Sequence, residues 1–195
     1  MDIDRQYKFI YKTKYSWDIR IKKFSENYLI KLINKFEYNR TKLTYLDIKN
    51  RNDIISGTYL LYSIINDKPK FCYIGESKNV YLRFKQHING YLNGKDKLYS
   101  KIRKRVKNLE DITFLVLNEI EDQNKRLMKE TYYIYATKSK FFSLNSKLVS
   151  RRMRCPNNHG CVKSRLAYDK NSEKLKLLIY GNCKNKECKT TFLIK

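Results

Sequence analysis

The chain has 195 residues, enough for one domain of ordinary size with small appendages and too few for two large domains. Hydrophobic residues make up 42% and aromatic residues 14% of the chain, which excludes global disorder although 32% of the residues are charged. The formal net charge is +24, from 43 Lys and Arg against 19 Asp and Glu. Nucleic acid is the leading partner because phosphate contacts release counterions, but a basic surface also suits ribosomal RNA, an anionic membrane or heparin.

The sequence predicts neither a membrane-spanning segment nor a signal peptide. It contains no run of about 18 apolar residues, and the N-terminus from Met1 to Arg5 lacks the apolar stretch of a signal peptide. We therefore expect a soluble, intracellular protein with no membrane partner. Four of the five cysteines form two pairs near the C-terminal end, and Cys72 stands alone in an expected strand. In an intracellular chain such pairs favour metal ligation over disulfides.

Residues 1–55 are expected to form an N-terminal basic helical extension. Apolar residues recur at helical spacing between Trp17 and Phe36, which predicts one amphipathic helix. Its Lys and Arg side chains either touch DNA or form an ordinary solvated face, and a solvated face is the commoner situation. The sequence assigns no chemistry to this extension.

Residues 56–150 show the pattern of a compact α/β sandwich. Residues 58–65 and 71–74 are rich in aromatic and β-branched residues and flank the turn cluster Asn66 to Pro69, which predicts a β-hairpin. A helix over about residues 79–87, capped by Ser77, is expected next. The remaining expected elements are a basic helix over about 97–107, a strand over 112–117, a helix over about 123–138 and a further segment over 141–148.

Residues 151–195 are expected to form a separate, small module. A hairpin-like pair of segments, residues 162–168 and 174–180, surrounds a polar turn. The short basic stretch from Ser150 to Arg154 links this module to the preceding domain.

The four paired cysteines of this module suit a zinc site. Cys155 and Cys161 form one possible knuckle, and Cys183 and Cys188 form the other. Four thiolates fit tetrahedral structural Zn²⁺, although both spacings are wider than the common Cys-x-x-Cys. His159 is an alternative ligand in place of Cys161, and two disulfides or free thiols are the alternatives without metal. The zinc hypothesis predicts a zinc-ribbon-like module that depends on the bound metal for much of its folding stability.

The middle of the chain contains a set of residues that together form a motif: Gly57-Thr58-Tyr59, Tyr73-Ile74-Gly75, Arg83, His87, Glu130 and Asn145. Their order and approximate spacing resemble the GIY-YIG nuclease superfamily over about residues 56–148. The resemblance implies a compact GIY-YIG sandwich built from a β-hairpin, helices and a third strand. Thr58 departs from the usual aliphatic residue, and the turn before Tyr73 is longer than usual. Tyr62 therefore competes with Tyr59 as the motif tyrosine, although the preceding Gly57 favours Tyr59.

The resemblance also implies catalytic roles for these residues. Phosphodiester hydrolysis needs a positioned water, stabilisation of charge on the phosphate and protonation of the leaving oxygen. Tyr73 would take a proton from the water if nearby cations lower its pKa, and Tyr59 would position that water or share the role. Arg83 would contact the scissile phosphate. His87, on the same helix face, would relay a proton or bind phosphate.

Glu130 would be the acidic ligand of one hydrated Mg²⁺ or Mn²⁺, and Asn145 would brace the site. Together these features predict a metal-dependent endonuclease of double-stranded DNA, of the homing type, with restriction-type or structure-selective repair enzymes as alternatives. A catalytically inactive nucleic-acid-binding protein is the alternative of another class. No small-molecule substrate is expected, and the oligomeric state is open. Phosphate contacts are expected from basic residues of the 97–107 helix and the tail, namely Lys101, Arg103, Lys104, Arg105, Arg151, Arg152, Arg154, Lys163 and Arg165.

Overall fold

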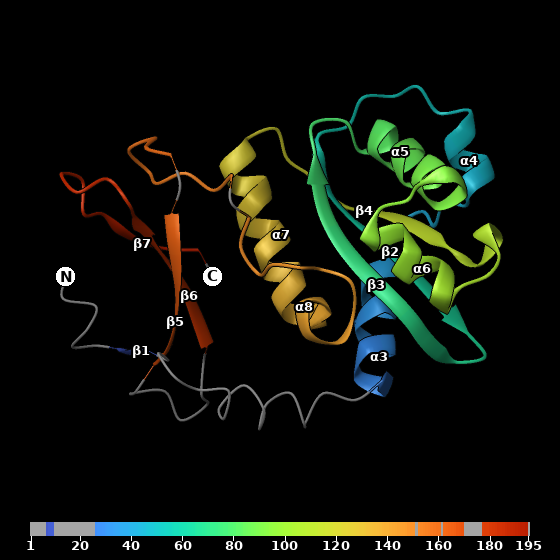
Figure 1. The fold of residues 1–195 in the computed structure, drawn as a ribbon, viewed down its shortest axis with the longest axis horizontal. Helices are drawn as coiled ribbons and strands as arrows, with labels where there is room; N and C mark the ends of the chain where they lie inside the picture. Colours follow the sequence, from blue (N-terminus) through green and yellow to red (C-terminus); the bar gives the residue numbers. More distant parts are fainter. Residues whose placement is uncertain (1–6, 10–25, 151, 161, 170–176, 195) are drawn as a thin grey trace. The chain divides into compact units, whose positions relative to one another are not determined.

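The computed structural model describes residues 7–9, 26–150, 152–160, 162–169 and 177–194 (Figure 1). By their contacts these residues fall into two compact units. One contains the described residues from 26 to 148. The other combines the N-terminal strand β1 (Tyr7–Phe9) with the described residues from 149 onward.

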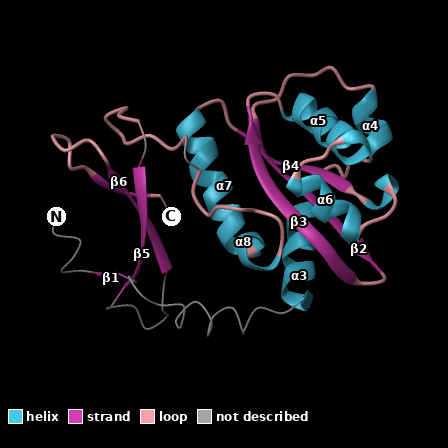
Figure 2. Ribbon diagram, viewed as in Figure 1, coloured by secondary structure: helices cyan, strands magenta, loops and turns pink. Residues whose placement is uncertain are grey.

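The first unit is built on a three-stranded antiparallel sheet with the order β3-β2-β4 (Figure 2). The strands are β2 (Gly57–Ile65), β3 (Lys68–Ser77) and β4 (Thr113–Glu119). Asn66 and Asp67 join β2 to β3 with φ angles of 51° and 56°, as a two-residue turn with two left-handed positions requires. Pro69 is tolerated because β3 is an edge strand. The expected hairpin is therefore present, and its second strand is longer than predicted.

Helices cover both faces of this sheet. The helices α4 (Tyr45–Lys49), α5 (Val80–Asn93) and α6 (Lys97–Arg105) share one apolar core with Tyr59 and Leu61 of β2. The helices α3 (Glu26–Glu37) and α7 (Gln123–Thr137) contact β2 or β3. Tyr62 lies on the opposite side of β2 from Tyr59 and Leu61. Its hydroxyl donates a hydrogen bond to Glu37 of α3. The short elements η1 (Leu109–Asp111) and α8 (Ser139–Phe142) complete the unit. The expected compact α/β sandwich is confirmed.

Several boundaries differ from those predicted. Asn79, not Ser77, caps α5, because its side-chain oxygen accepts from the Leu82 backbone N–H at 2.9 Å. The helix then continues to Asn93, six residues past the expected end. Of the helix predicted between Trp17 and Phe36, the structure describes α3, and the part from residue 17 to residue 25 lies outside the described residues.

The second unit is a four-stranded antiparallel sheet with the order β1-β5-β6-β7. Strands β5 (Val162–Asp169) and β6 (Leu177–Cys183) form the hairpin that the sequence predicts, and β7 (Thr191–Leu193) extends it. Strand β1 pairs with the far end of β5, with Tyr7 opposite Asp169. The N-terminal segment thus contributes a strand where only helix was expected.

Among the described residues, no helix combines the length and the apolar character needed to cross a membrane.

Candidate active site and metal centre

Tyr59 and Gly75 lie opposite each other in the β2-β3 ladder. Tyr59 is 1% exposed, and the outer end of its ring lies over the glycine. A Cβ added at Gly75 would come within 2.3 Å of the Tyr59 hydroxyl oxygen, so any larger residue would displace the ring. The glycine of Tyr73-Ile74-Gly75 is therefore needed for the tyrosine of the neighbouring strand.

Arg83 and His87 of α5 both reach the hydroxyl of Tyr59. The Arg83 Nε donates to the Tyr59 oxygen at 3.4 Å, and His87 Nε2 lies 3.0 Å from the same oxygen. As expected from their spacing of four residues, both side chains lie on one face of α5. This arrangement favours Tyr59 over Tyr62 as the motif tyrosine, because Tyr62 points to the other face of the sheet and bonds to Glu37.

His87 is a buried, neutral imidazole. It is 2% exposed, and burial, reinforced by the nearby Arg83 guanidinium, lowers its pKa to about 3. Its second nitrogen, Nδ1, lies 3.2 Å from the hydroxyl of Tyr99 on α6. A ring that is held between two hydroxyls inside the protein favours a hydrogen-bonding role over direct phosphate binding.

Tyr73 lies beside this pair. Its ring centroid is 6.5 Å from that of Tyr59 and 5.5 Å from that of His87. Burial raises the pKa of Tyr73, Glu130 raises it further, and Arg83 opposes both effects. Burial likewise raises the pKa of Tyr59 well above its ordinary value. These effects leave the pKa of both hydroxyls above its ordinary value, so both carry their protons at neutral pH. The role of Tyr73 as a base therefore stays a prediction that requires cations beyond Arg83 to lower its pKa.

Glu130 approaches the two tyrosines from α7 and is half-buried. Its charge acts on the hydroxyls of both Tyr59 and Tyr73, which places it at the same site. One helical turn earlier, Arg126 forms an ion pair with Glu76 of β3, with Nε and Oε2 2.9 Å apart. Arg126 also donates to the backbone carbonyls of Ile120 and Glu121. These contacts fix α7, and with it Glu130, against the strand that carries Tyr73.

Asn145 closes the edge of β3 next to Tyr73. Its Oδ1 accepts from the Ile74 N–H at 2.9 Å, and its Nδ2 donates to the Ile74 carbonyl at 2.7 Å. Two residues earlier, the Ser143 hydroxyl accepts from the Cys72 N–H at 2.7 Å. The two side chains therefore act as a substitute neighbouring strand, with Tyr73 between their attachment points. This contact supports the bracing role expected of Asn145.

The predicted basic contacts of α6 divide into two groups. Lys101, Lys104 and Arg105 are exposed. Arg103 is half-buried and donates to the carbonyls of Gly90, Tyr91 and Gly94, so its guanidinium holds the last turn of α5. No local pattern distinguishes Arg103 from its exposed neighbours, because its acceptors lie on another helix.

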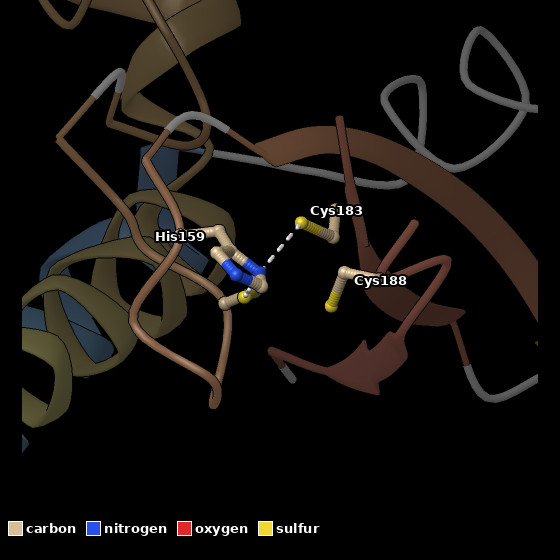
Figure 3. A group of neighbouring side chains, drawn as sticks. His159, Cys183 and Cys188 are labelled. Carbon is tan, nitrogen blue, oxygen red and sulfur yellow. Dashed lines mark hydrogen bonds between the residues drawn. The ribbon is translucent and has the colours of Figure 1, made fainter. Parts of the chain in front are cut away.

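The second unit contains a cluster of four side chains of the types that ligate metals: Cys155, His159, Cys183 and Cys188. Figure 3 shows His159, Cys183 and Cys188 of this cluster. Their ligand atoms all lie within 4.8 Å of one another. His159 Nδ1 is 3.6 Å from Cys155 Sγ and 3.7 Å from Cys183 Sγ. Tetrahedral zinc, with Zn–S near 2.3 Å and Zn–N near 2.0 Å, separates a sulfur and a nitrogen ligand by about 3.6 Å. The donor set and its spacing therefore fit Zn²⁺.

The loops around this cluster have the local contacts of a metal knuckle. The Asn185 N–H donates to Cys183 Sγ at 3.4 Å, and Asn157 Nδ2 donates to Cys188 Sγ at 3.4 Å. Such donors stabilise thiolates that bind a metal. The described cysteines form no disulfide. Cys161, which was predicted as the fourth ligand, lies outside the described residues, and His159 completes the cluster among those that are described.

The basic residues expected to bind phosphate in this unit are only partly described. Arg152, Arg154 and Lys163 are exposed, Arg165 lies in β5, and Arg151 lies outside the described residues. Arg154 also donates to the Asn158 carbonyl at 3.3 Å, which ties it to the loop between Cys155 and His159.

Comparison with known proteins adds one finding. A family model described as the GIY-YIG catalytic domain matches residues 56–145. No curated protein and no solved structure matches the chain. The matched range begins at Ser56, just before β2, and ends at Asn145.

Proposed function

The chain contains a GIY-YIG catalytic domain at residues 56–145, and from this premise we propose that it is a metal-dependent endonuclease of double-stranded DNA. One observation carries the proposal. Tyr59, Tyr73, Arg83, His87 and Glu130 come from two strands and two helices, yet direct contacts or charge interactions link all of them. A protein that only bound nucleic acid would need no buried Tyr-His pair with an arginine and a carboxylate beside it.

Each side chain has a chemical task in hydrolysis. The half-buried Arg83 guanidinium offers planar donors to the scissile phosphate, where negative charge develops. The Tyr73 hydroxyl positions the attacking water, and the Arg83–Tyr59–His87 hydrogen bonds hold the neighbouring hydroxyl. Glu130 would hold Mg²⁺ or Mn²⁺, and the bound ion would stabilise charge on the phosphate and the leaving oxygen.

The second unit serves DNA binding in this proposal. Cys155, His159, Cys183 and Cys188 hold one structural Zn²⁺, which supplies folding free energy to a unit too small to depend on its core alone. The metal-pinned loops then present Arg152, Arg154 and Lys163 to phosphates. The net charge of +24 is consistent with such a partner.

Within this class we propose a homing-type enzyme. A catalytic domain followed by a small basic zinc module suits homing enzymes, whereas the RING-like module of structure-selective nucleases needs about eight ligands. The described residues of the second unit contain one group of four. A restriction-type enzyme is the second candidate. The two differ in site length, because a homing enzyme cuts at one long site and a restriction enzyme at many short ones.

The test is cleavage of supercoiled plasmid and of genomic DNA by the purified protein with Mg²⁺, Mn²⁺ or EDTA. Glu130→Gln is expected to abolish cleavage and leave DNA affinity nearly unchanged, because affinity is spread over many Lys and Arg. Glu26→Gln, an exposed substitution on α3 with the same change in charge, is the matched control. Full binding without cleavage in any metal would instead support the inactive nucleic-acid-binding alternative, and mapped ends on genomic DNA separate the homing and restriction types.

A further inference from the structure

The hydrogen bonds of the site extend to Tyr99, a residue that is not among the motif residues. Tyr99 of α6 is 8% exposed, and its hydroxyl lies 3.2 Å from His87 Nδ1. Its ring packs on Gly90 of α5, where an added Cβ would come within 2.2 Å of the ring carbons. Gly90 lies three residues after His87 on the same helix. The glycine therefore opens the surface of α5 for Tyr99 and lets its hydroxyl reach the histidine.

Two bonds around Tyr59 decide which nitrogen of His87 carries the proton. Arg83 donates to the Tyr59 oxygen, so the proton of that hydroxyl must point to another acceptor. His87 Nε2, at 3.0 Å, is in place to accept it. A neutral imidazole has one acceptor and one donor nitrogen, so Nδ1 carries the proton and donates to the Tyr99 oxygen.

We propose that Tyr99 is a positioning residue for the cleavage reaction, because its hydroxyl keeps His87 in the Nδ1–H tautomer. In that tautomer Nε2 accepts the proton of Tyr59, and the Tyr59 oxygen keeps its lone pairs for Arg83 and the reaction site. Without the Tyr99 oxygen the Nε2–H tautomer competes, and Nε2–H turns the Tyr59 hydroxyl proton toward the reaction site. The inference rests on the proposed nuclease function for its kinetic consequence, and on the hydrogen-bond geometry around the buried, neutral His87 for the tautomer.

Tyr99→Phe tests the proposal because it removes one oxygen and keeps the ring on Gly90. Tyr91→Phe is the matched control, since Tyr91 is also buried and donates through its hydroxyl, but to the carbonyls of Val106 and Lys107. We expect Tyr99→Phe to lower kcat about 10- to 100-fold, by analogy with the loss of a hydrogen bond that orients a metal-binding histidine, with KM unchanged. Tyr91→Phe is expected to keep the wild-type kcat.

Nitrogen-15 NMR of the imidazole rings gives the readout that a merely structural role would not move. The chain has two histidines, so only two rings contribute, and the spectrum of His159→Ala assigns them. The wild-type protein is expected to show His87 as the Nδ1–H tautomer, and Tyr99→Phe a mixture with Nε2–H. An Nε2–H tautomer in the wild type, or an unchanged spectrum with unchanged kcat in Tyr99→Phe, would overturn the proposal. If the wild type cuts no DNA, the proposed function fails while the spectra still decide the Tyr99–His87 bond.

Discussion

Glu76 of β3 and Arg126 of α7 form an ion pair in which both side chains are 1% exposed, with Oε2 and Nε 2.9 Å apart. A buried pair contributes little over apolar packing, but removing one partner leaves an uncompensated charge inside the protein. Glu76 lies three residues after Tyr73, and Arg126 lies one helical turn before Glu130. The ion pair therefore joins the strand that carries Tyr73 to the helix that carries Glu130.

Glu76→Ala is expected to lower the free energy of unfolding by roughly 3–5 kcal/mol, because Arg126 keeps its charge in a buried place. Urea denaturation at neutral pH measures the loss. Asp53→Ala is the control, since it breaks the pair of Arg51 and Asp53, whose side chains are 39% and 60% exposed, and should cost less than about 1 kcal/mol. Equal effects of the two substitutions would show that burial does not govern the Glu76 pair.

The local parts of this site are readable from the sequence. The hairpin follows from the aromatic and β-branched runs around Asn66 and Asp67, and the four-residue spacing of Arg83 and His87 places them on one helix face. From the sequence, Gly75 is recognised only as part of the Tyr73-Ile74-Gly75 motif. The reason for it, a tyrosine ring lying over its backbone, depends on a cross-strand neighbour.

The parts that sequence reasoning missed are contacts between segments far apart in the chain. Asn145 bonds to Ile74, 71 residues away, and Arg126 pairs with Glu76, 50 residues away. Strand β1 is three residues long and pairs with β5 near the other end of the chain, so no local pattern announces it. Gly90 is a local signal that could have indicated a contact such as that of Tyr99, because a glycine inside a helix marks a close approach.

His87 predicts a particular dependence of stability on pH. Its pKa in the folded protein is lowered to about 3 from the ordinary 6.5. The unfolded chain therefore binds a proton as the pH falls below 6.5, and the folded protein does not until about pH 3. The contribution of His87 to the free energy of unfolding is therefore fully present above pH 6.5. Between pH 6.5 and about pH 3 it declines by about 1.4 kcal/mol for each pH unit.

The measurement is the free energy of unfolding of the wild type and of His87→Gln between pH 7 and pH 4. Glutamine has no proton to gain, so the difference between the two curves isolates His87 from the carboxylates that titrate in the same range. The wild-type advantage should shrink toward acid. Parallel curves would mean that His87 takes up its proton in the folded protein as readily as in the unfolded one.

The contrast between Lys101 and Arg103 predicts two kinds of defect on one helix. Lys101 is exposed, so Lys101→Ala should weaken DNA binding and reduce the salt slope of the logarithmic affinity by about 0.9 if it contacts one phosphate. Arg103 donates to three carbonyls at the end of α5, so Arg103→Ala should lower stability instead. Titrations at several salt concentrations, paired with thermal unfolding, separate the effects. A larger change of salt slope in Arg103→Ala would reverse the assignment.

The zinc cluster predicts which substitutions remove the metal. His159 Nδ1 lies at tetrahedral separation from two of the cysteine sulfurs, so His159→Ala should lower zinc well below one ion per chain. Cys183→Ser should do the same. Cys161→Ser should keep one zinc per chain, because the described cluster is complete without Cys161. Metal analysis of the purified variants, with far-UV circular dichroism to follow the β-sheet of the second unit, gives the comparison.

Loss of zinc should also weaken DNA binding, while the catalytic residues stay in place. The matched range of the catalytic domain ends at Asn145, ten residues before Cys155, and contains every predicted catalytic side chain. We therefore expect His159→Ala to bind DNA more weakly and with a smaller salt slope, and to retain slow, less specific nicking. A wild-type protein that is folded and active without zinc would remove the metal site. Zinc lost in Cys161→Ser and retained in His159→Ala would instead return the fourth position to Cys161.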